Sequence, residues 1–467
     1  MDEFGGAKLG DARRQQRLVA MAAQAARRPA GMVTGVFPIG AQREAVYRLL
    51  SNEASSREAL GASAYQAAAR RCAEYADAIV PMDGSSLNLR DPSRRRGLGP
   101  VGSRQMGAQG VLVMSALALN PQGTPLGLLD QHYWTRSPLP PKRVARQRGS
   151  KHDKRPRETR ESFIWVEAMR RVTKVMAVAA PETRPWFQLD RGADCMSVLM
   201  EAADAQMHVT VRAVYRERCL RWPNGRDGNL ASSMRRQPVI GTYPVDVPPR
   251  LGQLERTATM AVRVARMPLL LRIGKKRRRV LEVTTILAIE QNPPRGETPL
   301  CWMLFTTHKV VTIADAMAVV DAYSRRWRIE DFHKTWKSGA CNIESTKLES
   351  KDSILRWATI MASVAARIEH IKHAARTTPD APATSVFSRD EIDAAILLYK
   401  AGVTKIRVPY SRGDTPTVGQ VTGWIASLGG HMGNPKTRPP GAKVIHRGLE
   451  FVAGAAFALA ALRREKM

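Results

Sequence analysis

Residues 110–136, "GVLVMSALALNPQGTPLGLLDQHYWTR", decide the fold. Two strand-like apolar runs flank the sequence Asn-Pro-Gln-Gly at residues 120–123, which is typical of a hairpin turn because these residues favour turn conformations of the backbone. A shorter apolar run, "DAIVPMD" at residues 77–83, precedes the hairpin and ends at Asp83. The stretch therefore predicts a sheet that begins with one strand and a hairpin.

The segments after the hairpin alternate between helix and strand. Residues 161–180, "ESFIWVEAMRRVTKVMAVAA", have the apolar spacing of an amphipathic helix. The next runs predict a strand, "PWFQLD" (185–190), which ends at Asp190, then a helix, "ADCMSVLMEAADAQ" (193–206), and a strand, "HVTVRAV" (208–214). This order is typical of a mixed α/β sheet with helices on its faces.

The rest of the chain predicts three domains. An α/β domain of residues 69–350 carries a β-rich insertion at about 215–310, where long strand-like alternations recur. Helical domains of residues 1–68 and 351–467 flank it. The last apolar stretch, "GLEFVAGAAFALAALRREK" (448–466), is shorter than a membrane span and suits packing or self-association.

The charge of the chain indicates a polyanionic partner. Its 467 residues contain 73 Lys and Arg against 42 Asp and Glu, a formal net charge of +31. The beginning of the sequence lacks the features of a signal peptide, and no apolar run reaches the roughly 18 residues of a spanning helix. We therefore expect a cytoplasmic, nucleoid-associated protein without a membrane partner. Five scattered cysteines without a Cys-x-x-Cys pair favour free thiols over a disulfide framework or a zinc site.

An N-terminal helix concentrates positive charge. Residues 11–30, "DARRQQRLVAMAAQAARRPA", are Ala-rich with helical apolar spacing, and Arg13, Arg14 and Arg17 lie in the first turns. The charge of the whole chain favours DNA recognition by these arginines. The alternative is a solvated helix face whose arginines only keep the domain soluble.

A second helix, "YSRRWRIEDFHKTWK" (323–337), places a carboxylate among cations. At about 100° per residue, Tyr323, Arg326, Glu330 and Lys337 fall within roughly a 60° arc, whereas Asp331 lies about 80° away. An ordinary i,i+4 salt bridge between Arg326 and Glu330 would explain such a face.

Two aspartates at predicted strand ends favour a metal site instead. Asp83 and Asp190 each close an apolar run, a place where α/β sheets build sites, although each by itself is more often a turn residue. Three carboxylates brought together repel unless a cation compensates, and two Mg²⁺ ions about 4 Å apart can act on a phosphodiester. Asp83, Asp190 and Glu330 would bind metal, and Arg326 and Lys337 would hold nearby phosphates.

The helix also resembles a known family. Tyr-x2-Arg-x3-Glu-x6-Lys is similar to the YREK signature of bacterial insertion-sequence transposases of the DDE class, and "YSRRWRIEDFHKTWKSGA" to the Tn-five-type members of the IS-four family. Further similar segments are "PMDGSSLNL", "LDRGAD", "NPPRGETPLCWMLFTT", "LGDARRQQRLVAMAAQAA" and "LGGHMGNPKTRPPGAKVIHRGLEF". These segments lie between residues 9 and 451, so the resemblance extends over nearly the whole chain.

The resemblance implies an RNase H-like catalytic domain at residues 69–350, a DNA-binding domain at 1–68 and a dimerisation domain at 351–467. It implies cut-and-paste transposition of DNA: nicking at the inverted repeats of the transposon ends, hairpin formation, hairpin opening and strand transfer by a homodimer. Asp83, Asp190 and Glu330 would be the catalytic and metal-binding triad, with two Mg²⁺ ions that Mn²⁺ can replace. Tyr323, Arg326 and Lys337 would contact DNA phosphates.

Some positions leave alternatives open. Trp302 matches the family tryptophan that stacks on a flipped base, but within "LCWMLF" it could equally be a core aromatic of a strand. Gly84 and Gly192 stand where the family has Thr and Glu, and the basic loop 135–160 is either a phosphate-contacting loop or a linker. The alternative function is a catalytically inactive DNA-binding relic or transposition inhibitor of the same fold.

Overall fold

A long mixed sheet organises the molecule. The computed structural model describes residues 3–91, 95–102, 107–136, 161–249, 255–273, 277–404, 415–433 and 439–465. Its strands are β1 (Asp77–Leu89), β2 (Gly99–Pro100), β3 (Gln109–Leu119), β4 (Pro125–Trp134), β5 (Arg184–Leu189), β6 (His208–Arg212), β7 (Cys219–Arg221), β8 (Asp227–Asn229), β9 (Gly241–Val247), β10 (Arg256–Ile273), β11 (Arg277–Glu290) and β12 (Cys301–Thr306). They form one sheet in the order β2-β3-β1-β5-β6-β12-β11-β10-β7-β8, with β4 beside β3 and β9 beside β10.

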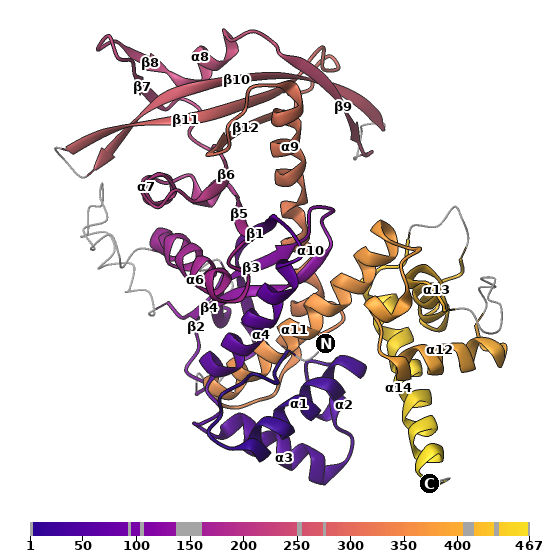
Figure 1. Ribbon diagram of the computed structural model, residues 1–467. Coiled ribbons are helices and arrows are strands. Elements are labelled where there is room, and N and C mark those ends of the chain that lie inside the picture. Colours follow the sequence, from indigo (N-terminus) through magenta and orange to yellow (C-terminus); the bar gives the residue numbers. More distant parts are fainter. Residues whose placement is uncertain are drawn as a thin grey trace.

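Helices cover this sheet and extend the chain at both ends (Figure 1). They are α1 (Ala12–Arg27), α2 (Val33–Val36), α3 (Gly40–Ser51), α4 (Arg57–Cys72), α6 (Ile164–Ala179), α7 (Met196–Asp204), α8 (Leu230–Arg235), α9 (Ile313–Ser324), α10 (Arg328–Lys337), α11 (Lys351–Thr377), α12 (Arg389–Lys400), α13 (Val418–Leu428) and α14 (Ala442–Glu465). β1, β5 and β6 run parallel, and the other pairings are antiparallel. The predicted mixed α/β sheet is confirmed.

The hairpin of β3 and β4 forms as the turn sequence predicts. Asn120 closes the turn with its backbone N–H donating to the Thr124 carbonyl at 3.0 Å, and its side-chain oxygen accepts from the backbone N–H of Gln122 at 3.1 Å and of Thr124 at 2.8 Å. Gly123 has a φ of +86°, a conformation that glycine adopts without strain. Local chemistry therefore determines this turn.

The strand that carries Asp83 is longer than its apolar run predicts. β1 continues beyond Asp83 to Leu89, because its pairing with β3 extends from Asp83 opposite Ser115 to Leu89 opposite Gln109. The prediction that the strand ends at Asp83 was therefore wrong. Polar residues such as Asn88 occupy its exposed positions, so hydrophobicity alone did not reveal this part of the strand.

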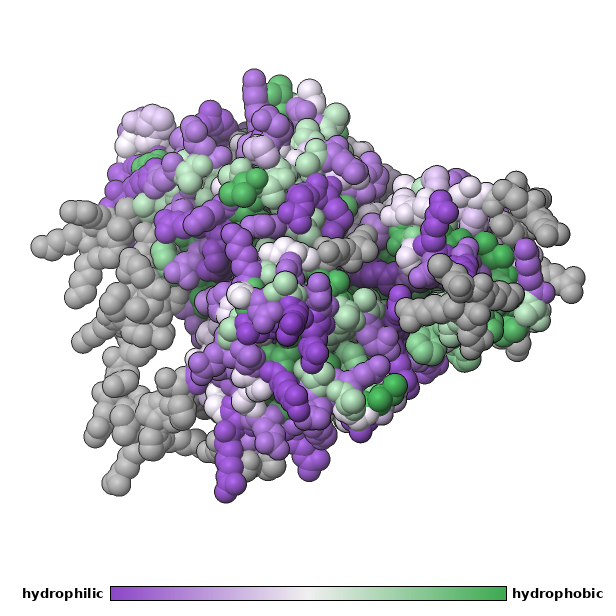
Figure 2. All heavy atoms as spheres, turned by 60° about the horizontal axis from the view of Figure 1, so that its bottom comes forward, coloured by the Kyte–Doolittle hydropathy of each residue, from purple (hydrophilic) through white to green (hydrophobic). Residues whose placement is uncertain are grey.

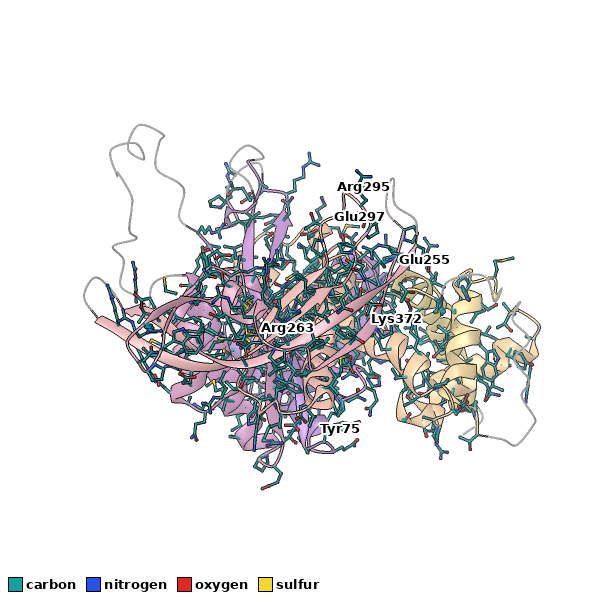
Figure 3. The ribbon with its side chains drawn as sticks, turned by 90° about the horizontal axis from the view of Figure 1, so that it is seen from above. Tyr75, Glu255, Arg263, Arg295, Glu297 and Lys372 are labelled. Carbon is teal, nitrogen blue, oxygen red and sulfur yellow. The ribbon has the colours of Figure 1, made fainter. Side chains whose placement is uncertain are left out.

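The β-rich segment predicted at 215–310 continues the central sheet. β12 pairs antiparallel with β6 on one side and with β11 on the other, and β11 and β10 form a long two-stranded ribbon. In the view from above, this ribbon passes over the body of the protein while the C-terminal helices lie to one side (Figure 3). The segment also contains α8, which packs against β10.

The N-terminal helices share a hydrophobic core with the sheet and α11. Leu18 and Met21 of α1 and Leu50 of α3 belong to the same buried cluster as Val111 of β3 and Trp357 of α11. Hydrophilic residues cover much of the outer surface of the N-terminal helices, which is turned toward the viewer in Figure 2. The boundary at residue 68 stays a prediction.

The C-terminal helices have a core of their own. Ile392, Trp424 and Leu449 are buried together with the end of α11, around Ile371. Among the described residues, a 22-residue stretch of α14, Ala442–Arg463, is long and apolar enough to cross a membrane, with a mean hydropathy of 1.4. The prediction that this stretch is too short was therefore wrong. Its buried face packs against α12 and α13, so length and hydropathy are weak evidence for a membrane span here.

Candidate active site

Neighbouring parallel strands bring Asp83 and Asp190 together. Met82 of β1 lies opposite Leu189 of β5, so the aspartate that follows each of them occupies the same edge position on adjacent strands. Asp190 also caps the short 3₁₀ turn Arg191–Ala193, because its Oδ1 accepts from the Gly192 N–H at 2.7 Å. The topology therefore places the two carboxylates that were predicted as partners side by side.

Glu330 comes to this edge on α10. The stretch 323–337 was predicted as one helix, but the 3₁₀ turn Arg325–Trp327 separates α9 from α10. The i,i+4 contact survives this break, because Arg326 Nη2 donates to Glu330 Oε1 at 2.6 Å. The Arg326 side chain is only 9% exposed and that of Glu330 is 38% exposed, so the carboxylate keeps access to solvent.

The electrostatics show that the three carboxylates share one site. Burial raises the pKa of Asp83 to about 7, the Asp190 charge and more weakly the Glu330 charge add to this rise, and Arg326 opposes it. Burial is the main cause of this rise, and the two neighbouring carboxylates contribute to it because adjacent like charges disfavour ionisation. Arg326 also keeps Nη1 buried with no hydrogen-bond partner among the residues that the structure describes. The carboxylates could therefore bind a cation, and Nη1 of Arg326 could donate a hydrogen bond to an oxygen of a bound ligand.

Tyr323 and Lys337 flank the carboxylates. Tyr323 is 2% exposed, and burial raises its pKa against the influence of Arg326 and Arg212. Lys337 Nζ donates to Ser85 Oγ at 3.2 Å and lies 3.9 Å from Glu344 Oε1. Lys337 therefore contacts β1, the strand that carries Asp83.

Trp302 lies beside this site on β12. Its ring meets the Tyr323 ring edge to face, with centroids 5.6 Å apart at 77°, and the Arg212 guanidinium lies 5.7 Å from its centroid. The side chain is half-buried, so base stacking and core packing both stay open. Sequence reasoning missed Arg212, although a cation inside the apolar run "HVTVRAV" was a detectable signal.

His333 was also missed as a neighbour of Asp83. Its Nδ1 lies 3.7 Å from Asp83 Oδ2, and Nε2 lies within hydrogen-bond distance of Ser115 Oγ, 3.2 Å. Burial and the nearby Lys337 and Arg326 charges lower its pKa to about 3, so the imidazole is neutral. Its position three residues after Glu330 places it near the same helix face, which was the available signal.

Arg13, Arg14 and Arg17, the predicted DNA-contacting arginines of the N-terminal helix, lie on α1. Arg13 and Arg17 are exposed. Arg14 is half-buried and its Nη1 donates to the Leu9 carbonyl, so part of its donor capacity stabilises the start of the helix. The role of all three stays a prediction, and most of loop 135–160 lies outside the described residues.

An open cavity of about 600 Å³ is lined partly by residues that follow Asp83 and Asp190 in the chain. Gly84 and Gly192, the two departures from the family pattern, line it together with Ser85, Trp165 and Arg136. A Cβ at Gly192 would stand 3.0 Å from Asp190 Oδ1, closer than ordinary packing, whereas one at Gly84 would only touch Met114 at 3.8 Å. Glycine at position 192 therefore relieves crowding of a candidate ligand.

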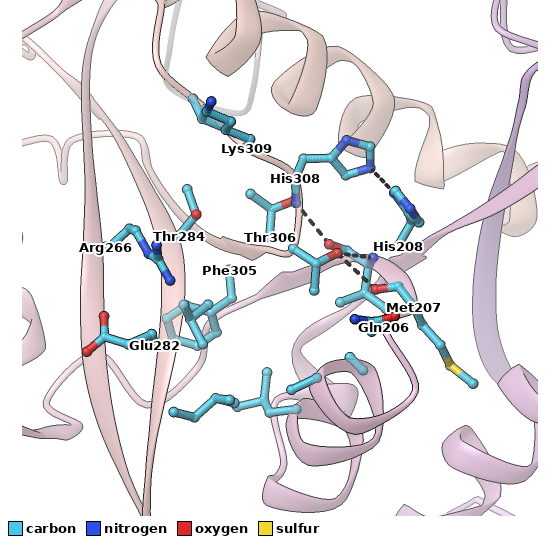
Figure 4. Close-up of a pocket in the computed structure, with 18 of the residues that line it drawn as sticks. Gln206, Met207, His208, Arg266, Glu282, Thr284, Phe305, Thr306, His308 and Lys309 are labelled. Carbon is cyan, nitrogen blue, oxygen red and sulfur yellow. Dashed lines mark hydrogen bonds between the residues drawn. The ribbon is translucent and has the colours of Figure 1, made fainter.

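A second cavity, of about 610 Å³, lies at the opposite edge of the sheet (Figure 4). His208 at the start of β6 and His308 after β12 line it, and their Nδ1 and Nε2 atoms are 3.2 Å apart. The cavity lies at the end of the sheet where the parallel strands β5 and β6 begin. Asp190 follows the last residue of β5, at the other end of these strands, so the cavity is separate from the carboxylates.

Asp331 takes part in a different cluster from Glu330. Asp331, Glu369 and His373 have ligand atoms close enough to hold a metal ion. Lys372 occupies this cluster: its Nζ lies 3.2 Å from Asp331 Oδ2 and forms an ion pair with Glu369. Lys372 lies where the body of the protein meets the C-terminal helices (Figure 3). Lys372 thus already offsets part of the negative charge of this cluster.

Two family models match the chain. One, described as transposase DNA-binding, matches residues 1–55, and the other, described as transposase DDE domain, matches residues 144–366. The second match contains Asp190 and Glu330, and Asp83 precedes it. A DDE domain implies an RNase H-like fold and generally uses divalent metal ions, in agreement with the mixed sheet and its carboxylate edge. The chain therefore contains a transposase DNA-binding domain and a transposase DDE domain, and these together support its assignment as a DDE transposase.

Proposed function

We propose that this protein binds the inverted repeats at transposon ends and catalyses cut-and-paste transposition by hydrolysis, hairpin formation and strand transfer at phosphodiesters. The observation that carries the proposal is the convergence of Asp83, Asp190 and Glu330, which come from two strands and a helix far apart in the sequence. The match to a transposase DDE domain supports the same reaction class.

The donor set fits a hard divalent cation. Carboxylate oxygens are the ligands that Mg²⁺ prefers, and Mn²⁺ accepts the same set. Burial and, to a smaller extent, the charges of Asp190 and Glu330 raise the pKa of Asp83, and a cation beside these carboxylates would offset both effects. Asp83, Asp190 and Glu330 would hold the metal, and we propose two ions. When bound, the metal would polarise the phosphodiester and lower the pKa of the attacking hydroxyl or water.

The basic groups around the carboxylates would bind and orient DNA. Within the described part of the chain, the buried Nη1 of Arg326 has no hydrogen-bond partner, and a guanidinium matches the geometry of phosphate oxygens. Lys337 would add a second cation next to β1, and Tyr323 would complete the phosphate contacts. Trp302, half-buried beside Tyr323, is the candidate platform for an unstacked base during hairpin formation.

We further propose that α1 contributes to end recognition and α14 to a homodimer. Arg13 and Arg17 are exposed within the segment that matches the DNA-binding model, and Arg14 lies beside them. On α14, Phe451 and Phe457 are 57% and 76% exposed, and hydrophobic patches gather on the lobe of the C-terminal helices (Figure 2). A second copy of the chain would cover such a patch.

A cleavage assay tests this function. Linear DNA that carries the inverted repeats flanking the coding sequence is incubated with full-length protein and Mg²⁺ or Mn²⁺, and nicked and hairpin products are resolved on a denaturing gel. Wild type and the exposed control Glu349→Gln should cut the ends, whereas Glu330→Gln should bind them and leave them intact.

Two outcomes would contradict the proposal. If wild type binds the ends but neither nicks nor hairpins them, the protein is a DNA-binding relic or inhibitor. If Glu330→Gln cuts as wild type does, its carboxylate is not part of the site.

A further inference from the structure

A row of polar side chains crosses three strands beneath α10. Asp83 of β1 pairs with Ser115 of β3, and Ser115 pairs with Gln131 of β4. Directly paired residues project from the same face of a sheet, so the three side chains lie in one line. Ser115 is 0% and Gln131 2% exposed, so both depend on partners inside the protein.

These partners form a chain of hydrogen bonds whose direction is defined from Tyr133 to Ser115. The Tyr133 hydroxyl donates to Gln131 Oε1 at 2.9 Å, and Gln131 Nε2 donates to Ser115 Oγ at 3.3 Å. Ser115 Oγ lies 3.2 Å from His333 Nε2. The serine hydroxyl can donate its proton to Nε2 while its oxygen accepts from Gln131. A neutral imidazole that accepts at Nε2 carries its proton on Nδ1.

The other ring nitrogen of His333, Nδ1, lies near Asp83, one of the three candidate metal ligands. His333 Nδ1 is 3.7 Å from Asp83 Oδ2, a contact that is electrostatic rather than a formed hydrogen bond. The opposite tautomer would turn the Nδ1 lone pair toward the carboxylate and leave the Ser115 hydroxyl proton without this acceptor. The chain of hydrogen bonds therefore favours the tautomer that attracts Asp83.

We propose that His333 is a positioning residue for Asp83. Tyr133, Gln131 and Ser115 hold the imidazole in the Nδ1–H tautomer, and this N–H orients the Asp83 carboxylate beside Asp190 and Glu330. The inference rests on the proposed function, because it concerns the same metal-binding site. Groups that orient a metal ligand in this way commonly change metal affinity by about 10- to 100-fold when they are removed.

Two amide substitutions separate positioning from simple packing. An asparagine at position 333 places its amide near the location of Nδ1 and keeps a donor for Asp83, whereas a glutamine places it near Nε2 and keeps only the contact with Ser115. Mn²⁺ affinity is measured on full-length protein by electron paramagnetic resonance, with thermal melting as the folding check. We expect His333→Gln to bind Mn²⁺ about 10- to 100-fold more weakly than wild type, and His333→Asn to stay close to wild type.

Asp83→Asn provides the reference that keeps the two proposals distinguishable. If wild type binds Mn²⁺ no better than Asp83→Asn, the metal site of the proposed function is wrong and this inference falls with it. If wild type binds better but the two His333 variants match it, only the positioning role is overturned. Equal weakening in both His333 variants with an equal loss of melting temperature also overturns it, because that result indicates packing alone.

Discussion

The buried ion cluster at Lys372 makes a sharp prediction for the stability of the link between α10 and α11. Glu369 is 0% exposed and forms an ion pair with Lys372. Its carboxylate also accepts a hydrogen bond from Thr335 Oγ1 at 2.5 Å. His373 Nε2 lies 3.5 Å from Glu369 Oε2. Substituting Lys372→Met keeps the aliphatic stem but removes the cation. We expect a loss of about 3–5 kcal/mol in the free energy of unfolding, because a buried charge is left without its main partner.

The pH dependence identifies the cause of that loss. Although burial raises the pKa of Glu369, His373, Lys372 and Thr335 together lower it below 4.5, and His373 and Lys372 lower that of Asp331. The wild-type cluster therefore stabilises the fold above the ordinary carboxyl pKa and loses this contribution as the pH falls through the lowered values. Without Lys372, burial dominates and Glu369 takes up a proton, at a cost that rises with pH. The destabilisation should thus be smallest at a pH below the lowered carboxyl pKa values, should grow as the pH rises through 4.5, and should be largest above pH 7.

Calorimetric melting of the full-length protein across this pH range provides the assay. The double variant Lys372→Met/Glu369→Gln carries no buried charge at these positions and should recover much of the loss, without its pH dependence. Lys347→Met, a change at an exposed lysine, is the matched control for loss of surface charge. A destabilisation by Lys372→Met that is equal at pH 5 and pH 8 would refute the electrostatic explanation.

Three further predictions concern packing, thiol chemistry and assembly. Gly31→Ala should destabilise the protein by about 1–3 kcal/mol in urea unfolding, because a Cβ there would overlap the Asn342 backbone; unchanged stability would mean that the two segments separate easily. In native protein, Ellman's reagent should react with exposed Cys219 and leave Cys72, whose pKa burial raises to about 12, until unfolding; rapid reaction of both would show that this core opens. Phe457→Glu should reduce dimerisation in light scattering while melting stays near wild type, and an unchanged mass would exclude this face of α14.

Much of the architecture was predictable because it depends on local chemistry. The Asn120 turn determines the hairpin through bonds within five residues, and the periodic apolar positions of 161–180 predict the helix observed as α6. The i,i+4 pair of Arg326 and Glu330 likewise follows from helical spacing. The Arg326–Glu330 pair forms although a 3₁₀ turn at residues 325–327 interrupts the predicted helix. No local signal predicted this turn.

Other features could not be predicted because their causes lie far away in the chain. β1 extends past Asp83 because β3 is there to pair with it, and the packing of one face of α14 against α12 and α13 is likewise a tertiary contact. The buried partners of His333 and Asp331 come from β3 and from α11. Spacing within one helix gives no information about them.

The sequence by itself determined which residue types are available: three carboxylates, the cations beside Glu330 and an excess of positive charge suited to DNA. Only the tertiary structure decided that Asp83 and Asp190 are neighbours, through the register of parallel strands, and that Glu330 faces them while Asp331 faces Lys372. The physical reason is the range of the forces involved. Turn and helix geometry act over a few residues, whereas the repulsion that makes these carboxylates a candidate metal site exists only once the sheet has brought them together.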